Sequence, residues 1–344
     1  MSTLASMTAV RLHAAKDLRV ETIPVPSNPT PNDVVIRVAF AGICGSDLHN
    51  FRTGQWITRA PSVAGHEFSG EVERVGSAVT GFDAGDRVVV DSRYTCGQCA
   101  ACANGKPQIC ETLGFVGEAI DGGFAEFVTI PANLLVKADP AANLDVLSLA
   151  EPLAVALHAI GRLSPGPKDP VLIIGCGPIG ALSAIVASQE SERAVLVADR
   201  NAERADAVSA FVGHQAASSH GELPSMTDHG VPVHHILDTT GNVAVLDELI
   251  ARFAGATIGL VGIGSGEISI DPVHLVEREI ALVGCHAFND ELAQAVSQLE
   301  RHPERFRPVL GQAFDLEDAA KAYEIASSGH GRSIKTLFKI GGHV

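Results

Sequence analysis

Four cysteines fall within one short stretch of the 344-residue chain and have the spacing of a metal site. They follow the pattern Cys-x-x-Cys-x-x-Cys with a fourth thiol shortly after, and they are Cys96, Cys99, Cys102 and Cys110. Four thiolates at such spacing can surround one tetrahedral ion, and four sulfur ligands leave no open position for a substrate. We therefore expect a structural zinc site. Disulfides and an iron–sulfur cluster are the alternatives, because similar spacings occur in some cluster proteins.

A second set of metal-ligand residue types is dispersed along the chain. Cys44 lies in the segment GICGSDLH, His66 and Glu67 lie in GHEFSGEV, and Glu151 precedes a proline. One thiolate, one imidazole and carboxylates can hold Zn²⁺ with a position left for water or substrate. Taken singly, these residues have ordinary explanations as a buried small side chain, a core histidine and an acidic helix start. Their joint occurrence predicts a catalytic zinc site.

An apolar run followed by a glycine turn predicts a dinucleotide site. The run at 171–174 leads into Gly175-Cys176-Gly177-Pro178-Ile179-Gly180, and an apolar helical stretch follows. The first glycine allows the turn, the second lets the backbone approach a pyrophosphate, and the third lets helix and strand pack closely. The start of the helix then offers unpaired N–H groups to the phosphates. A glycine turn in a buried sheet without a ligand is the alternative.

The residue at the end of the next apolar run bears on the choice of cofactor. Asp199 follows the run at 194–198, where a carboxylate can accept hydrogen bonds from the adenosine ribose and repel a 2′-phosphate. Arg200 beside it can accommodate that phosphate or flank the adenine. We expect NAD in preference to NADP.

Composition and charge exclude several classes of protein. Hydrophobic residues make up 46% of the chain, which is enough for a large core and argues against disorder. The formal net charge is −15, so we expect no nucleic-acid partner. No run of about 18 apolar residues and no apolar N-terminal stretch occurs, which argues against a membrane partner and a secretory signal. We therefore expect a cytoplasmic protein, and the length suits two domains.

The elements that position these residues change character along the chain. In the first part, apolar and polar residues alternate, and prolines and glycines interrupt the pattern. This predicts a barrel-like, β-rich domain with strands at 8–12, 18–23, 34–40, 68–75, 87–90 and 124–130. The second part predicts strands at 171–174, 194–198, 236–238, 257–261 and 280–283 alternating with helices at 149–160, 180–190, 201–212 and 243–253. This alternation is typical of a doubly wound parallel sheet, so the fold class is α/β. Helices starting near 291 and 316 and a strand at 335–340 complete the chain.

Five segments together resemble the zinc-containing medium-chain dehydrogenase/reductase (alcohol dehydrogenase) family. In chain order they are GICGSDLH, GHEFSGEV, CGQCAACANGKPQIC, EPLAVALH and GCGPIG, and the resemblance covers nearly the whole chain. The His66-Glu67 and Glu151-Pro152 pairs are similar to the polyol and sugar-acid branch, which includes sorbitol dehydrogenases. The segments DGGF at 121–124 and FNDELAQAV at 288–296 are similar to those of L-idonate 5-dehydrogenases.

The resemblance implies a fold and a set of binding residues. It implies a GroES-like catalytic domain, residues 1–152 and 290–344, interrupted by a Rossmann domain, residues 153–289. Catalytic zinc is then bound by Cys44, His66 and one or both of Glu67 and Glu151, and the glutamates can exchange between direct and water-mediated contact. The implied cofactor-binding residues are Gly175, Gly177, Pro178, Ile179, Gly180, Asp199, Arg200 and Val261. The family also implies a homodimer or homotetramer.

The resemblance further implies a zinc-dependent transfer of hydride from a secondary alcohol of a polyol or sugar acid to NAD. The alcohol oxygen binds zinc, which lowers its pKa. Ser46 takes the proton and passes it through the cofactor ribose and His49 towards solvent, while Asp47 orients the motif. A helix-capping serine and a surface histidine are the alternative interpretations. The alternative functions are a threonine or simple alcohol dehydrogenase and a non-catalytic nucleotide-binding protein.

Several further residues bear on the substrate. Family position points to Phe51, Phe115 and Glu151 as pocket residues, although both aromatic rings can equally belong to the core. Polyol enzymes of the family carry an arginine after a late glycine, and the segment GCHAF at 284–288 has none, so His286 replaces it or the substrate differs. A sugar acid would need a cationic anchor, for which the sequence offers Arg52, Arg59 and Arg93.

Overall fold

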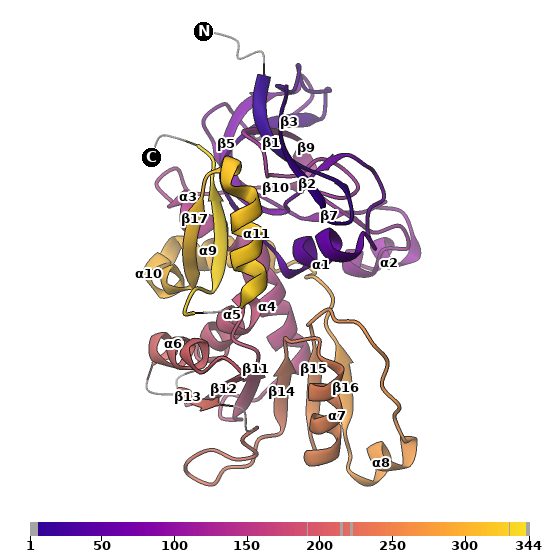
Figure 1. Ribbon diagram of the computed structural model, residues 1–344, viewed down its shortest axis with the longest axis vertical. Helices are drawn as coiled ribbons and strands as arrows, with labels where there is room; N and C mark the ends of the chain where they lie inside the picture. Colours follow the sequence, from indigo (N-terminus) through magenta and orange to yellow (C-terminus); the bar gives the residue numbers. More distant parts are fainter. Residues whose placement is uncertain (1–5, 191, 214–215, 221–222, 330, 342–344) are drawn as a thin grey trace. The chain divides into compact units, whose positions relative to one another are not determined.

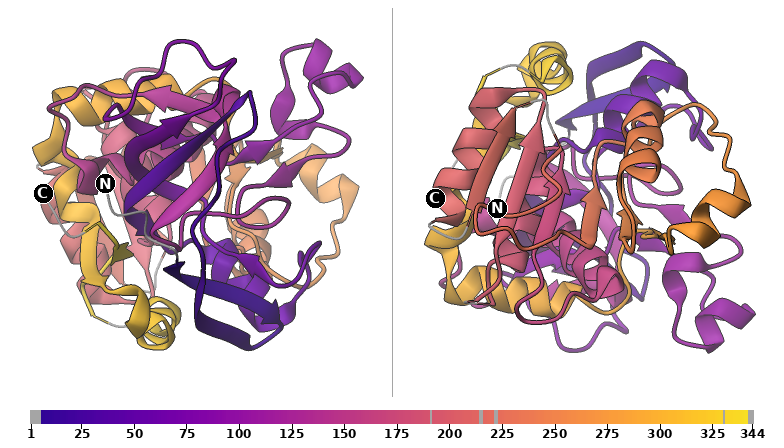
Figure 2. Two further views of the ribbon diagram at one scale, coloured as in Figure 1. Left: turned by 90° about the horizontal axis from the view of Figure 1, so that it is seen from above. Right: turned by 90° about the horizontal axis from the view of Figure 1, so that it is seen from below.

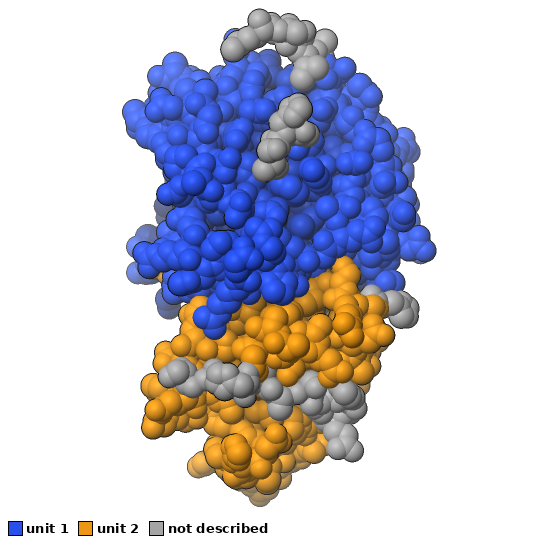
Figure 3. All heavy atoms as spheres, turned by 90° about the vertical axis from the view of Figure 1, so that its left-hand side faces the viewer, with its two compact units in different colours: residues 1–151, 292–329, 335–344 blue, residues 152–291, 330–334 orange. Residues whose placement is uncertain are grey.

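The computed structural model describes residues 6–190, 192–213, 216–220, 223–329 and 331–341 (Figure 1). The chain forms two compact units, which Figure 3 distinguishes by colour. Unit 1 consists of residues 1–151, 292–329 and 335–344, and unit 2 of residues 152–291 and 330–334. Within the described parts of the chain, none of the helices has the length and apolar character needed to cross a bilayer.

Unit 1 is built mainly from β-strands. Its main sheet has the strand order β10-β6-β5-β3-β18-β17, with β9 also paired to β3, and a smaller sheet has the order β2-β1-β4. The strands are β1 (Ser6–Ala14), β2 (Asp17–Pro24), β3 (Asp33–Gly42), β4 (Ser62–Val63), β5 (Glu67–Val75), β6 (Arg87–Val90), β7 (Arg93–Tyr94), β8 (Gly114–Phe115), β9 (Phe127–Pro131), β10 (Leu135–Lys137), β17 (Leu310–Phe314) and β18 (Lys335–Lys339). The helices of unit 1 are α1 (Gly45–Thr53), α2 (Ala100–Ala103), α3 (Leu144–Leu147), α9 (Leu292–Arg301), α10 (Pro303–Phe306) and α11 (Ala319–Ser328).

Strand β3 holds the centre of unit 1. Most of its residues are buried, and they share one apolar core with Phe68, Phe124 and Phe338. Its last residue, Gly42, pairs with Glu67 of β5 on one side and with Leu337 of β18 on the other. The start of β5 and the start of β18 therefore meet beside the end of β3.

Unit 2 contains a parallel six-stranded sheet with the order β13-β12-β11-β14-β15-β16. This is the doubly wound order of a dinucleotide-binding fold, with the first strand in the middle. Its strands are β11 (Val171–Ile174), β12 (Val195–Asp199), β13 (Ala216–His220), β14 (His235–Asp238), β15 (Thr257–Leu260) and β16 (Ala281–Gly284). Its helices are α4 (Ala150–Leu163), which begins in unit 1, α5 (Pro178–Ala187), α6 (Ala202–Val212), α7 (Val243–Arg252) and α8 (Pro272–Glu277), and Figure 2 shows them alongside the strands.

The α/β class and the parallel sheet are confirmed, and several element boundaries differ from the predicted ones. Helix α5 begins at Pro178 rather than at 180, because a proline is well suited to the first turn of a helix. The predicted strand at 124–130 begins only at Phe127. Strands β13 and β17 and helix α8 were not predicted, because their short sequences carry little apolar periodicity.

Candidate active site

Helix α1 presents the first metal-ligand residue from its N-terminus. Cys44 is the N-cap residue, and its backbone N–H donates to the Asp47 carboxylate at 2.9 Å. The other carboxylate oxygen of Asp47 lies 3.7 Å from Nδ1 of His66. Asp47 therefore orients both the helix start and the imidazole. Since the cap position belongs to Cys44, Ser46 does not serve as the helix cap.

Glu67 begins β5, and His66 immediately precedes it. His66 and Glu67 are buried, and the Oγ atom of Ser46 lies 3.4 Å from Nε2 of His66. The ligand atoms of Cys44, His66 and Glu67 all lie within 4.8 Å of one another. A thiolate, an imidazole and a carboxylate at this separation form a donor set that suits Zn²⁺. The residues present therefore fit a zinc ion.

A buried lysine completes this group, and no pattern in the sequence indicates it. Lys335, the first residue of β18, is only 1% exposed, and its Nζ contacts a carboxylate oxygen of Glu67 and donates to the Ile43 carbonyl at 3.0 Å. A side chain at Gly42 would place its Cβ 2.4 Å from Cε of Lys335, so the glycine makes room for the lysine. Burial alone lowers the pKa of Lys335, but the neighbouring carboxylate of Glu67 raises it above its usual value. Glu67 is therefore paired with a permanent cation.

Glu151 lies near this group but outside the set of three close ligand atoms. It is buried in the first turn of α4, and its carboxylate accepts a hydrogen bond of 2.7 Å from the hydroxyl of Ser92. Burial raises its pKa to about 7, and His66 lowers it in turn. The structure thus gives Glu67 and Glu151 different partners.

Acidic groups dominate the surroundings of the imidazole. Burial lowers the pKa of His66, yet Asp47 and Cys44 together raise it well above its ordinary value. Glu118, in the loop after β8, is a further carboxyl group that sequence reasoning missed. Burial raises its pKa to about 7, while the charge of His66 lowers it. The group is therefore close enough to the imidazole to interact with it electrostatically.

His49 lies four residues before the last residue of α1 and is half-buried. Its Nε2 atom is 2.8 Å from Oε1 of Gln55, and its ring lies 4.6 Å from that of Trp56. It is therefore a packed side chain with a defined hydrogen-bond partner rather than a free surface histidine.

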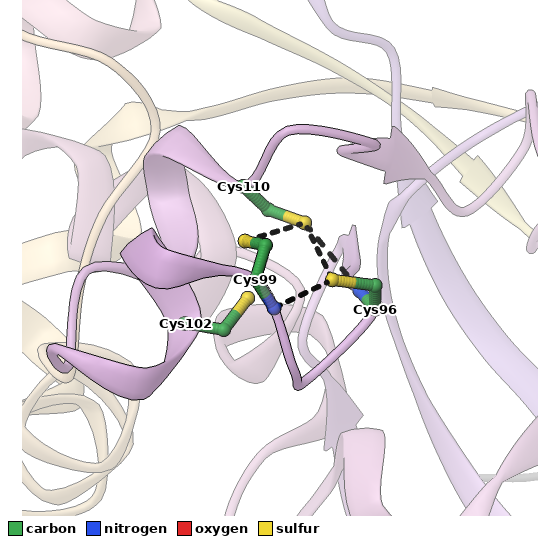
Figure 4. A group of neighbouring side chains, drawn as sticks. All are labelled: Cys96, Cys99, Cys102 and Cys110. Carbon is green, nitrogen blue, oxygen red and sulfur yellow. Dashed lines mark hydrogen bonds between the residues drawn. The ribbon is translucent and has the colours of Figure 1, made fainter.

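The four cysteines of the loop around α2 gather into one cluster (Figure 4). Sγ of Cys110 lies 3.5 Å from Sγ of Cys96 and 3.9 Å from Sγ of Cys99, and all seven cysteines are free thiols. Two sulfurs bound to one tetrahedral zinc ion at about 2.3 Å are about 3.8 Å apart. Backbone N–H groups of Cys96 and Cys99 point at sulfur atoms of the cluster. Cys102 is the fourth member of the cluster. The four sulfur atoms fit a closed zinc site. Because all four residues are free thiols, they form no disulfide in this structure.

The residues predicted to line the substrate pocket or to anchor a sugar acid have different surroundings. The ring of Phe115 lies 6.4 Å from that of His66, whereas Phe51 packs edge-on against the buried Tyr323 at 5.4 Å and belongs to the core. Two of the three candidate anchors are already in ion pairs: Arg59 with Asp121, and Arg93 with Asp91, each at 2.7 Å. Arg52 is exposed, and His286 follows β16 in unit 2.

The glycine turn of unit 2 has the geometry of a phosphate-binding loop. Gly175 has a φ of +93°, and a Cβ at Gly180 would lie 1.8 Å from the carbonyl oxygen of Gly175. Gly177 is the N-cap of α5, and a Cβ there would meet nothing within 4 Å. The turn is thus tight where it packs on the helix and open at the helix N-terminus, where an anion can approach.

A pocket of about 370 Å³ opens beside this turn within unit 2. Asp199 ends β12, and its carboxylate accepts hydrogen bonds from the backbone N–H groups of Cys176 at 2.6 Å and Asn201 at 2.7 Å. The pocket is lined by Ile174, Gly175, Ala198, Asp199, Arg200, Leu223, Thr240, Asn242, Val245 and Glu248. Of the predicted cofactor residues, Gly177, Pro178, Ile179 and Gly180 form the adjoining helix start, and Val261 follows β15 outside this lining.

Substituting Gly180 by alanine is expected to destabilise unit 2, because the added methyl group would overlap the backbone of Gly175. The matched control is Gly161→Ala in α4, where a Cβ meets nothing within 4 Å. That control should stabilise the protein by about 0.5–1 kcal/mol, because alanine favours a helix over glycine. Thermal unfolding followed by circular dichroism measures both. A Gly180→Ala protein with the melting temperature of the unmodified chain would contradict the tight packing.

Comparison with known proteins agrees with this geometry. Residues 30–140 match the alcohol dehydrogenase GroES-like domain. The chain is 31% identical to sorbitol dehydrogenase of Bos taurus, over 95% of this chain and 94% of the relative. It is 30% identical to L-idonate 5-dehydrogenase of Vitis vinifera, over 96% and 94% of the two chains.

A solved structure extends the similarity to the whole fold. An alcohol dehydrogenase of Escherichia coli CFT073, determined with NADH, superimposes with a TM-score of 0.86 at 28% identity and covers 98% of this chain and 100% of its own. A relative of 31% identity over nearly the full length, together with the matching GroES-like domain, establishes common descent. The chain therefore belongs to the zinc-type medium-chain dehydrogenase/reductase family and is an oxidoreductase.

Proposed function

We propose that this enzyme oxidises a secondary alcohol group of a polyol with NAD, with sugar acids as the second substrate class. The observation that carries the proposal is the grouping of three donor types, on Cys44, His66 and Glu67, within 4.8 Å. The hydroxyl of Ser46 stands 3.4 Å from one of these donors. We further propose that unit 1 corresponds to the catalytic domain predicted at 1–152 and 290–344, and unit 2 to the NAD-binding domain predicted at 153–289.

We assign the metal to side chains of unit 1. Cys44, His66 and Glu67 would hold the catalytic zinc, Glu151 would act directly or through water, and Cys96, Cys99, Cys102 and Cys110 would hold the structural ion. Bound zinc supplies a Lewis acid that polarises the substrate oxygen. Lys335 neutralises part of the charge of Glu67 and so keeps the donor set from accumulating negative charge.

The proton path is assigned to two residues of α1. Ser46 stands beside the donor group and is suited to accept the proton of the substrate hydroxyl. His49 lies one helical turn further along α1 and is half-buried, so it can pass a proton on to solvent. The glycine turn and the pocket beside Asp199 bind and orient the dinucleotide.

The charge of the site favours a neutral substrate over a sugar acid. His66 interacts electrostatically with Asp47, Glu118 and Glu151, and all three are acidic. A carboxylate substrate would add a further acidic group to these three. Two of the three arginines that could anchor it are engaged in ion pairs with Asp91 and Asp121. A polyol needs only hydrogen-bond partners and no cationic anchor.

Absorbance of NADH during incubation with NAD and a substrate panel tests the proposal. The panel contains polyols, aldonic acids, threonine and simple alcohols, and polyols are expected to give the highest kcat/KM. Faster turnover of threonine or a simple alcohol would replace the proposed substrate class. A protein that binds zinc and NAD but reduces no NAD with any of these compounds would favour the non-catalytic alternative.

The preference for NAD rests on the carboxylates of the pocket in unit 2. Asp199 and Glu248 both line it, and they outnumber the one guanidinium group, that of Arg200. Replacing Asp199 by serine removes a charge that repels a 2′-phosphate, so the ratio of kcat/KM for NADP to that for NAD should rise at least about tenfold. Glu248→Gln measures the contribution of the second carboxylate. An unchanged ratio in both variants would contradict this assignment.

We propose a homodimer or homotetramer as the active assembly. Strand β16 is an edge strand of the sheet, and apolar side chains of the neighbouring segment are exposed, including Val273 at 59% and Val276 at 76%. A free strand edge with exposed apolar residues is a common site of self-association. Light scattering coupled to size-exclusion chromatography measures the number of chains, and a monomer at micromolar concentration would contradict the proposal.

A further inference from the structure

The loop that follows α1 folds back onto the helix through a set of hydrogen bonds. Gly54 ends the helix in the left-handed conformation, with a φ of 69°, and its N–H donates to the carbonyl of Asn50 at 2.8 Å. The hydroxyl of Thr53 donates to the carbonyl of His49 at 2.9 Å and accepts from the N–H of Gln55 at 3.2 Å. These contacts fix the backbone at the point where the chain reverses.

The buried amide of Asn50 anchors the next residue of this loop. Its Oδ1 atom accepts a hydrogen bond of 3.0 Å from the backbone N–H of Trp56, and the side chain is only 6% exposed. As a result the side chains of Gln55 and Trp56 both lie against His49: Oε1 of Gln55 is 2.8 Å from Nε2, and the Trp56 ring is 4.6 Å from the imidazole with an interplanar angle of 31°. The ring is therefore held both along its edge and on one face.

An amide oxygen as partner selects one tautomer of the imidazole. With Oε1 of Gln55 facing the ring at 2.8 Å, the oxygen accepts, so Nε2 of His49 carries the hydrogen in this arrangement and Nδ1 keeps the lone pair. The same Nε2–H bond persists when Nδ1 gains a proton, so the ring need not turn during proton transfer. We propose that Gln55 and Trp56 are positioning residues for His49, and that Nδ1 is the atom through which His49 takes up and releases a proton. This inference rests on the proposed role of His49 in the proton path.

The partner of His49 is neutral, and this matters for release of the proton. Among the residues with described positions, no hydrogen bond or ion pair joins His49 to a charged side chain. Of the charged residues on α1, Asp47 is engaged with Cys44 and His66, and Arg52 is exposed. A carboxylate in the place of Gln55 would stabilise the imidazolium and retain the proton. An amide fixes the ring without that electrostatic cost.

Trp56 is the single tryptophan of the chain, so tryptophan fluorescence reports on its surroundings, which include the ring of His49. Because its ring lies 4.6 Å from that of His49, protonation of the imidazole is expected to quench its emission, which gives a pH transition without metal, cofactor or substrate. Gln55→Glu should move the midpoint of this transition upward by about one pH unit, because an adjacent carboxylate favours the charged ring. His49→Asn should abolish the transition.

The decisive experiment compares this fluorescence titration with the pH profile of kcat for the same proteins. The inference requires that Gln55→Glu shift both midpoints upward together. It also requires that Gln55→Leu lower kcat about tenfold with little change in the KM for NAD. In a protein that already carries His49→Asn, neither substitution should change kcat further. Gln55 is exposed, so both variants are expected to fold.

Each other result overturns a separate part of the argument. A fluorescence midpoint that does not move with Gln55→Glu would show that the two side chains do not interact in solution, and would overturn the inference while leaving the proposed function intact. A shifted fluorescence midpoint with an unchanged kcat profile would remove His49, and with it Gln55 and Trp56, from the proton path. Absence of NAD reduction by the unmodified protein on the whole panel would overturn the proposed function itself.

Discussion

Replacement of Cys44 by serine is expected to lower kcat/KM for alcohol oxidation about a thousandfold. The thiolate is one of three donors within 4.8 Å to which we assign the catalytic ion, so its loss should weaken metal binding there. Lewis-acid stabilisation of a developing oxyanion contributes several kcal/mol, and each 1.4 kcal/mol corresponds to about a factor of ten in rate. The NADH absorbance assay measures the rate, and elemental analysis of the purified protein measures zinc per chain.

The zinc content separates this effect from a general loss of structure. The Cys44→Ser protein should keep the ion of the four-cysteine cluster and lose the other one. Cys285→Ala is the matched control, because Cys285 is buried in unit 2 and belongs to neither metal group. It should reduce stability slightly and leave zinc content and turnover unchanged. A Cys44→Ser enzyme with full zinc content and unchanged turnover would refute the assignment of the catalytic metal.

Replacement of Lys335 by methionine is expected to cost about 3–5 kcal/mol in the free energy of unfolding of the zinc-free protein. The side chains of Lys335 and Glu67 are 1% and 2% exposed, so the substitution leaves a buried carboxylate without its cation. Methionine preserves most of the packing of the lysine stem, which makes charge the main variable. Urea unfolding followed by circular dichroism measures the change.

Two further variants test the electrostatic origin of this loss. The double variant Glu67→Gln with Lys335→Met removes both charges and should recover most of the stability, because a neutral pair has no unpaired charge to bury. Lys168→Met breaks an ion pair with Glu192 whose side chains are 77% and 60% exposed, and it should change stability little. If the double variant is as unstable as Lys335→Met alone, packing rather than charge explains the effect.

The parts of the site that depend on local spacing could be predicted from the sequence. The four cysteines occupy one loop, and the glycine turn occupies one strand–helix junction, so neighbours in sequence are neighbours in space. The prediction of Cys44 and His66 as metal ligands also required the resemblance to a family, because neither residue by itself indicates a metal site. The orientation of Ser46 towards His66 also depends on which residue caps α1.

Long-range contacts could not be predicted in this way. Lys335 opens a strand, where a lysine usually points to solvent, and nothing in its neighbourhood indicates that its partner is Glu67, 268 residues earlier. Glu118 appears in the sequence as one more acidic loop residue, and only its partial burial and its interaction with the charge of His66 distinguish it. The contacts of His49 with Gln55 and Trp56 are local, but they depend on a turn at Gly54 whose direction the sequence does not specify.

The order of synthesis gives the Glu67–Lys335 contact a consequence for how the protein matures. The ribosome produces β5 long before β18, while all six strands and the glycine turn of unit 2 lie between them in the sequence without interruption from unit 1. Chains fold during translation roughly in the order in which segments emerge. The parallel sheet can therefore form while Glu67 still lacks its lysine and β3 still lacks its β18 neighbour. The nascent chain should thus acquire its nucleotide-binding fold first and its metal-binding centre last.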